Sequence, residues 1–101
     1  MKRTYRVYGF EGHRNRISFM QSFRIVRSDC TISVNCSDIT GTNDYVDVEI
    51  EALNEWLCVR AILAQESDGI FENTRTGSII DLATGADITY DYCNSLAEKE
   101  G

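Results

Sequence analysis

The sequence predicts an α+β fold: a single two-layer domain in which a mainly antiparallel sheet of four to six strands carries one main helix on one face. The chain has 101 residues, the usual length of one domain. Apolar and polar residues alternate in several segments, as in half-buried strands. The spacing changes clearly to three and four residues over 52–66. We therefore expect one globular domain over residues 1–96 and a frayed polar tail over 97–101.

Strands are predicted in six segments, which are 4–10, 16–27, 30–36, 45–51, 78–82 and 88–92. The first two are joined by a loop of about five residues and are expected to form an N-terminal hairpin. The last two are expected to form a C-terminal hairpin around a turn at 83–86. In the fourth segment Val46, Val48 and Ile50 point inward, and the acidic residues between them point outward.

The helix predicted over 52–66 has Asn54 as its candidate N-cap. One apolar stripe runs along it and consists of Leu53, Leu57, Ala61 and Ala64. Val59 and Ile62 lie on a different side of the helix from that stripe. A helix that is apolar on more than one side is either deeply buried or part of an interface. Because two-fold homodimers are common, a further hypothesis is that the chain dimerises through this helix.

Charge is distributed unevenly along the chain. Residues 1–27 hold seven basic side chains and one acidic one, whereas residues 28–101 hold three basic and fifteen acidic ones, and the net charge is −6. The predicted N-terminal hairpin gives a candidate nucleic-acid-binding basic face, made of Arg6, Arg14, Arg16 and Arg24. If the acidic strand lies beside this hairpin, cross-strand ion pairs neutralise the arginines. A negative protein also repels a polyanion.

The opposite interpretation makes the acidic strand the functional surface. Its candidate partner-binding acidic face consists of Asp44, Asp47, Glu49 and Glu51. Later acidic residues, Asp81, Asp87 and Asp91, could extend the negative surface. Such a surface can occupy the nucleic-acid groove of a basic protein, because complementary potentials steer the encounter. The alternative is that these charges only keep the domain soluble.

Catalytic and metal sites are not predicted. His13 is the only histidine and lies in a loop, and the chain has no glycine-rich phosphate-binding loop. The acidic loop 38–44 does not match the calcium-binding pattern, and the four cysteines have no zinc-ligand spacing. We expect no enzyme activity, no cofactor and no metal, and we expect the cysteines to be reduced thiols in the interior.

No segment is apolar and long enough to cross a membrane, so a cytoplasmic location is expected. The sequence thus predicts a non-enzymatic protein-interaction module. We expect a small acidic inhibitor of a basic, nucleic-acid-handling protein, of the size and composition of accessory proteins from phages or mobile elements. The alternative is a nucleic-acid-binding protein that uses the arginine-rich N-terminal hairpin.

Overall fold

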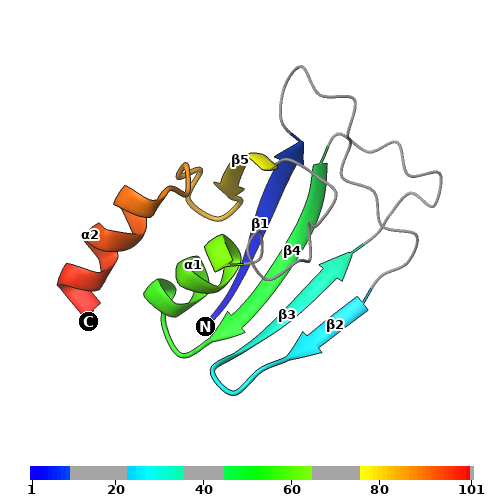
Figure 1. The fold of residues 1–101 in the computed structure, drawn as a ribbon, viewed down its shortest axis with the longest axis horizontal. Helices are drawn as coiled ribbons and strands as arrows, with labels where there is room; N and C mark the ends of the chain where they lie inside the picture. Colours follow the sequence, from blue (N-terminus) through cyan, green and yellow to red (C-terminus); the bar gives the residue numbers. More distant parts are fainter. Residues whose placement is uncertain (10–22, 36–44, 65–75, 101) are drawn as a thin grey trace.

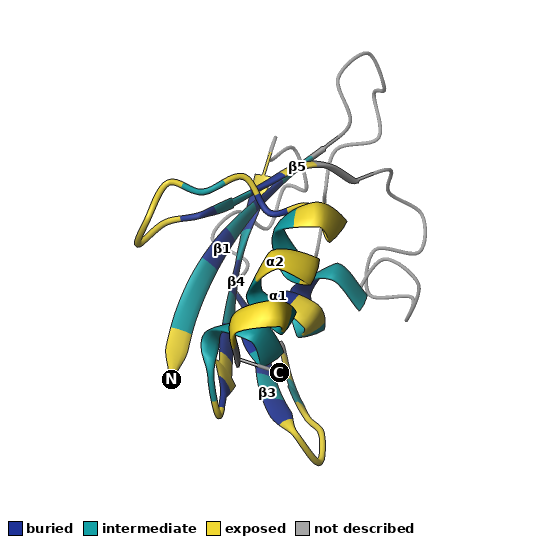
Figure 2. Ribbon diagram, turned by 90° about the vertical axis from the view of Figure 1, so that its left-hand side faces the viewer, coloured by how far each residue is buried: buried dark blue, intermediate teal, exposed yellow. Residues whose placement is uncertain are grey.

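A computed structural model describes residues 1–9, 23–35, 45–64 and 76–100 of the chain. Its elements in chain order are β1 (Lys2–Gly9), β2 (Phe23–Val26), β3 (Cys30–Asn35), β4 (Tyr45–Ala52), α1 (Glu55–Ala64), β5 (Thr76–Asp81) and α2 (Tyr90–Glu100). Within these residues the five strands form one antiparallel sheet in the order β2-β3-β4-β1-β5. Both helices lie on the same side of the sheet (Figures 1 and 2). The predicted α+β class, with one main helix on an antiparallel sheet, is confirmed.

The core lies between the sheet and α1. Strand side chains alternate between the two faces, so every second residue of the central strands points toward the helix. Tyr5 and Val7 of β1 and Val48 of β4 are fully buried there, as Figure 2 shows for their strands. From the opposite layer, α1 contributes Cys58, Val59 and Ile62. The remaining buried apolar residues are Cys30, Ile32, Val34, Val46, Ile50, Ala52, Ile79 and Ile88.

The N-cap of α1 is the one predicted: the Asn54 side-chain oxygen accepts a hydrogen bond from the Leu57 N–H at 2.9 Å. In the apolar stripe, Leu53 is 83% exposed and Leu57, Ala61 and Ala64 are half-buried. Val59 and Ile62, which lie on a different side of the helix from that stripe, are the ones buried in the core. Much of the apolar width of α1 is therefore used within the chain, and dimerisation through it stays a prediction.

The described strands of the predicted N-terminal hairpin, β1 and β2, are not neighbours in the sheet, and residues 10–22 of that prediction lie outside the described residues. β1 pairs with β4 on one side and with β5 on the other, while β2 pairs with β3 at the edge of the sheet. Tyr5 and Val7 are wholly buried in this central position. The register also places Arg6 directly opposite Asp47, an opposite-charge pair that favours this pairing.

The C-terminal hairpin is reduced to one bridge, and the chain then turns into a helix. The predicted turn exists, with Gly85 in the left-handed region at φ 76°. Behind it, Asp87 forms a single antiparallel bridge to Ile80. Thr89 then caps α2, since its hydroxyl oxygen accepts the Tyr92 N–H at 3.1 Å. Residues 97–100, expected to fray, belong to that helix.

Ile88, Tyr90 and Tyr92 alternate as in a strand, and a strand was therefore predicted. The same segment also fits the period of a helix. Tyr92, Cys93 and Leu96 are three and four residues apart and pack against the core, whereas Tyr90 is 68% exposed. The expected cysteine state is correct for Cys30 and Cys58, which are buried free thiols, and Cys93 is a half-buried one. Cys36 lies outside the described residues.

Candidate interaction surface

The side of the sheet that faces away from α1 carries most of the predicted functional residues. Within the described residues no helix covers it. We call this surface the open face, and from strand alternation and register it consists of Lys2, Thr4, Arg6 and Tyr8 of β1, Arg24 and Val26 of β2, Thr31 and Ser33 of β3, and Tyr45, Asp47, Glu49 and Glu51 of β4. It holds both signs of charge, so the two predicted charged faces merge into one surface.

At one end of the open face, Arg6 is held by its neighbours on β4. Its guanidinium donates to both carboxylate oxygens of Asp47, at 2.9 and 3.2 Å. The same guanidinium lies 4.2 Å from the centre of the Tyr45 ring, and Tyr8 packs against Tyr45 with ring centres 5.7 Å apart. The hydrogen bond to Asp47 raises the pKa of Arg6. This half of the open face is therefore internally neutralised, as cross-strand pairing predicts.

The other end of the open face holds exposed carboxylates beside basic side chains. Glu49 and Glu51 both lie near the Lys2 ammonium, at 3.9 and 3.7 Å. Two carboxylates share one cation there, and the Glu51 side chain is 60% exposed. A shallow hollow opens beside them, lined by Lys2, Arg24, Thr31, Ser33, Glu49 and Glu51. Its walls combine two carboxylates and two hydroxyl groups with the cationic side chains of Lys2 and Arg24, so an incoming cationic side chain would compete with these two for the carboxylates.

The structure brings some predicted residues together and separates others. Asp47, Glu49 and Glu51 form one column on β4, but Asp44, Arg14 and Arg16 lie outside the described residues. Arg6 and Arg24 share the open face, yet β3 and β4 lie between their strands. Asp81, expected to add to a negative surface, has a fully buried side chain and is not part of any surface. Asp87 and Asp91 are exposed near α2.

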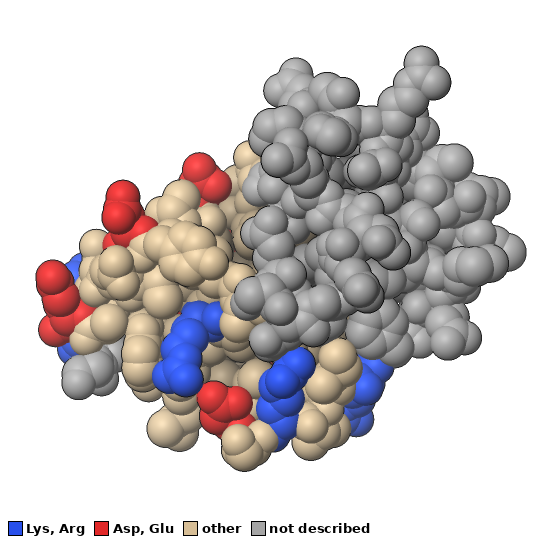
Figure 3. Space-filling model, in the orientation of Figure 1, with Lys and Arg blue, Asp and Glu red and all other residues tan. Residues whose placement is uncertain are grey.

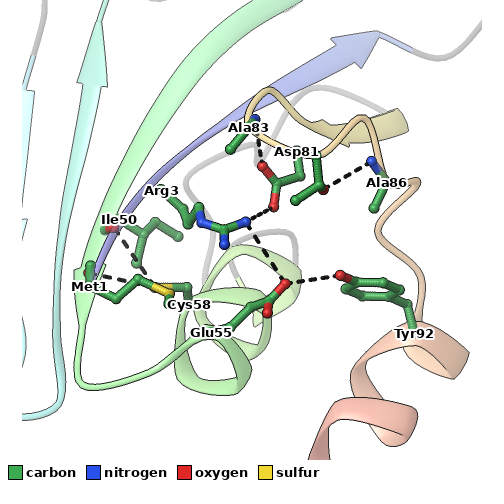
Figure 4. Close-up of polar contacts among 10 residues, drawn as sticks. Met1, Arg3, Ile50, Glu55, Cys58, Asp81, Ala83, Ala86 and Tyr92 are labelled. Carbon is green, nitrogen blue, oxygen red and sulfur yellow. Dashed lines mark hydrogen bonds and ion pairs between the residues drawn. The ribbon is translucent and has the colours of Figure 1, made fainter.

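A buried polar cluster, which the sequence analysis missed, lies on the helix side of the sheet (Figure 4). Arg3 donates to Oδ2 of Asp81 at 2.6 Å, and the other Asp81 oxygen accepts the Ala83 N–H at 2.8 Å. Glu55 lies 3.8 Å from the same guanidinium and accepts a hydrogen bond from the Tyr92 hydroxyl at 3.0 Å. The cluster thus joins β1 and β5 to both helices.

The alternation of inward and outward residues along the strands could have revealed this cluster, because odd-numbered residues of β1 and β5 point inward. Arg3 has the same parity as the inward-pointing Tyr5 and Val7, and Asp81 has that of Ile79. A basic and an acidic residue on apolar strand faces have to meet a partner, because an unpaired buried charge is costly. Burial lowers the pKa of Arg3, but the hydrogen bond and charge of Asp81 outweigh this effect and leave the pKa raised.

Beside this cluster lies an unsatisfied hydroxyl group. Tyr5 is fully buried, and its hydroxyl has no hydrogen-bond partner. Burial raises the pKa of Tyr5, and the nearby Cys58 and Asp81 raise it further. Cys58 itself lies 3.9 Å from the carbonyl oxygens of Met1 and Ile50, and burial raises the pKa of its thiol. These groups are shielded from solvent, so they are not part of the interaction surface.

No family model matches the chain, and neither curated proteins nor solved structures give a match. Among the described residues, neither helix is long and apolar enough to cross a membrane. In the same part of the chain, no three potential metal ligands gather into a cluster.

Proposed function

We propose that this chain is a non-enzymatic protein-binding module that acts in the cytoplasm and docks the acidic end of its open face onto a basic, nucleic-acid-handling protein. The observation that carries the proposal is the position of Glu49 and Glu51. They project from a central strand onto the uncovered side of the sheet, and they share a single lysine. Exposed carboxylates that are held only loosely within the chain can pair with basic side chains of a partner.

The acidic column divides into two parts with different tasks. Asp47 is bound in a bidentate pair by Arg6 of the same chain, and a partner would have to break that pair to use it. Glu49 and Glu51 hold Lys2 only at 3.7 to 3.9 Å, a loose contact between exposed groups. An arginine or lysine from a partner can replace or join Lys2 without uncovering any buried charge.

The hollow beside these glutamates supplies the matching geometry. Thr31 and Ser33 of β3 line it together with both carboxylates, so a partner guanidinium would meet charged and neutral acceptors at once. Binding of this kind would place a basic side chain of the partner on the open face. If that side chain normally contacts phosphate, its occupation would inhibit nucleic-acid binding by the partner.

The alternative function, nucleic-acid binding through an arginine hairpin, receives less support. Among the described residues β1 does not pair with β2, and Arg6 is neutralised by Asp47. Arg24 lies on the edge strand next to Ser33, with an exposed side chain. The described open face carries as many acidic as basic side chains, so it does not offer the net positive field that phosphate binding requires.

The test is affinity capture from a cell lysate with tagged forms compared side by side, each with and without nuclease. We expect wild type to retain a basic protein after nuclease treatment, and Glu49→Lys/Glu51→Lys to lose it. Asp87→Lys/Glu98→Lys makes the same change in net charge at exposed positions near and on α2, and it should retain the partner. Equal capture by both double variants would refute the acidic docking site. Recovery of nucleic acid that disappears with nuclease, and that Arg24→Gln weakens, would favour the alternative.

A further inference from the structure

Two neighbouring columns of side chains on the open face complement each other. One column lies on β1 and the other on β4, and the register fixes which residues stand side by side. From one end to the other, the pairs are Lys2 with Glu51, Thr4 with Glu49, Arg6 with Asp47 and Tyr8 with Tyr45. A basic group thus stands beside an acidic group at two levels, and one aromatic ring stands beside another at a third.

Two columns of this kind also match a second copy of themselves. A two-fold axis that runs between β1 and β4, in the plane of contact, places β4 of one copy over β1 of the other at the same level. Glu51 then meets Lys2 of the second copy, and Tyr45 meets Tyr8 of the second copy. Each contact occurs twice, because such an interface is isologous. Sheets pack face to face about 10 Å apart, a distance that pairs of these long side chains can span.

The balance of charge allows two open faces to approach each other. The charged members of the open face are Lys2, Arg6, Arg24, Asp47, Glu49 and Glu51, three of each sign. Two copies therefore do not repel through this face, although the net charge of the chain is −6. The helix side is different, since Figure 3 shows acidic side chains gathered over α2 and most basic ones along the lower edge.

The groups that would make these contacts are accessible. The side chains of Lys2 and Glu51 are 59% and 60% exposed. At the other end Tyr45 is 41% exposed, and its ring is held between the Arg6 guanidinium and the Tyr8 ring. A side chain that is already fixed loses little conformational entropy on association. Burial of the tyrosine rings also adds an apolar contribution, which ion pairs between exposed groups do not supply.

We propose that this chain forms a two-fold homodimer through its open face, with β1 and β4 of each copy beside the axis. The contact lies on the opposite side of the sheet from α1, the helix for which the sequence predicts dimerisation. The dimer needs no other protein, so it does not depend on the proposed function. It would, however, cover Glu49 and Glu51, so a basic partner would bind only the dissociated chain.

Sedimentation equilibrium of the purified chain tests the proposal. We expect wild type to pass from monomer to dimer as its concentration rises to about 1 mM. The dimer should weaken in about 1 M salt, which screens exposed charges. Lys2→Glu and Glu51→Lys should each raise the dissociation constant about tenfold or more, because each brings like charges together at two symmetric contacts. The wild-type series needs no variant, so a folding defect cannot hide the answer.

A mixture of the two variants gives the decisive measurement. The two glutamates of one chain, at positions 2 and 51, would face the two lysines of the other, so a heterodimer about as stable as the wild-type dimer should form. Within each variant chain the pair between these positions stays broken, and an effect inside the chain cannot cause the recovery. Lys99→Glu and Asp87→Lys make the same changes in net charge at exposed positions on and near α2. Each should dimerise as wild type does, and mixing them should add nothing.

Several outcomes would overturn the proposal. A wild-type chain that stays monomeric at about 1 mM would do so. A dimer that tolerates both Lys2→Glu and Glu51→Lys would place the contact on another surface, with α1 as the first to examine. Weakening without recovery in the mixture would mean that the two positions do not face each other. An equal gain on mixing Lys99→Glu with Asp87→Lys would reduce the effect to net charge.

Discussion

The Arg3 guanidinium and the Asp81 carboxylate meet at 2.6 Å in the interior, where Asp81 has no exposed surface and Arg3 is 18% exposed. This pair joins the central strand β1 to β5, and through Glu55 and Tyr92 it reaches both helices. Charges withdrawn from water gain stability only if each finds a partner. The pair therefore fixes the arrangement of β5 and the helices more than it adds net stability.

We predict that Asp81→Ala lowers the free energy of unfolding by about 3–5 kcal/mol, the usual loss when one partner of a buried ion pair is removed. The variant leaves Arg3 facing an apolar interior and the Ala83 N–H without its acceptor. Urea denaturation followed by circular dichroism measures the change. Asp87→Ala, at an exposed position six residues further on, is the matched control and should lose little. Equal losses in the two variants would contradict the role of the pair.

Replacing both partners should behave differently from removing one. In Arg3→Met/Asp81→Leu neither member of the pair remains, so the part of the loss that comes from the unpaired Arg3 should be recovered, although Glu55 loses its cation and the Ala83 N–H still lacks its acceptor. The same urea titration gives the answer, with Arg3→Met alone completing the double-mutant cycle. A double variant as unstable as Asp81→Ala would show that the loss comes from packing around β5 rather than from the unpaired charge.

The hydrogen bond between Tyr92 and Glu55 is expected to hold α2 against α1. Tyr92→Phe keeps the ring and removes the donor, so we predict a loss of about 1 kcal/mol in unfolding free energy. Amide hydrogen exchange should also become faster within Tyr90–Glu100 than in the strands. Tyr90→Phe makes the same chemical change on a tyrosine that is 68% exposed, and it should alter neither measurement.

The sequence predicted the strands and helices better than it predicted which strands lie next to one another. Alternation in the fourth strand correctly assigned Val46, Val48 and Ile50 to the core, and the helix and its Asn54 cap were also correct. Strand order could not be predicted in this way. A two-residue alternation shows which side chains share a face of the sheet, but it does not show which strands are neighbours. The expected hairpin was based on proximity along the chain, whereas β1 pairs with β4 and β5.

The residues of the candidate site were predicted, but the pairing of their charges was not. Asp47, Glu49 and Glu51 do lie on the open face, and the expected neutralisation takes place between Arg6 and Asp47. Only the register of β1 against β4 could show that Asp47 is paired while Glu49 and Glu51 share one lysine. A hollow lined in part by Arg27 and Arg60 could not be predicted either, because the turn and the helix that line it come together only in the tertiary structure.

The caps of the two helices provide a further test. Asn54 accepts the Leu57 N–H and Thr89 accepts the Tyr92 N–H, and each satisfies one donor that the helix itself cannot satisfy. We predict that Asn54→Ala and Thr89→Ala each lower the unfolding free energy by about 1 kcal/mol. Asn54→Ser and Thr89→Ser keep a capping oxygen and should restore most of the loss in thermal or urea denaturation. Failure of the serine variants to do so would assign the losses to other contacts.

Tyr5 should limit stability at alkaline pH. Burial raises the pKa of its phenol in the folded chain, whereas in the unfolded chain it ionises near its ordinary value of about 10. Above that pH the unfolded state holds fewer protons than the folded state, so stability falls as the pH rises, by up to about 1.4 kcal/mol per pH unit. Burial also raises the thiol pKa values of Cys30 and Cys58, so the decline begins earlier, near pH 9.

Tyr5→Phe isolates the contribution of this hydroxyl. Since the group is buried without a partner, its removal should raise the unfolding free energy at pH 7 by about 1 kcal/mol or more. The same variant should flatten the decline above pH 10 and leave the part due to the thiols between pH 9 and 10. Urea denaturation of both proteins from pH 7 to 11 measures both effects. Parallel pH profiles would mean that the phenol ionises equally in the folded and unfolded chains, and a less stable variant at pH 7 would mean that the hydroxyl has a partner in solution.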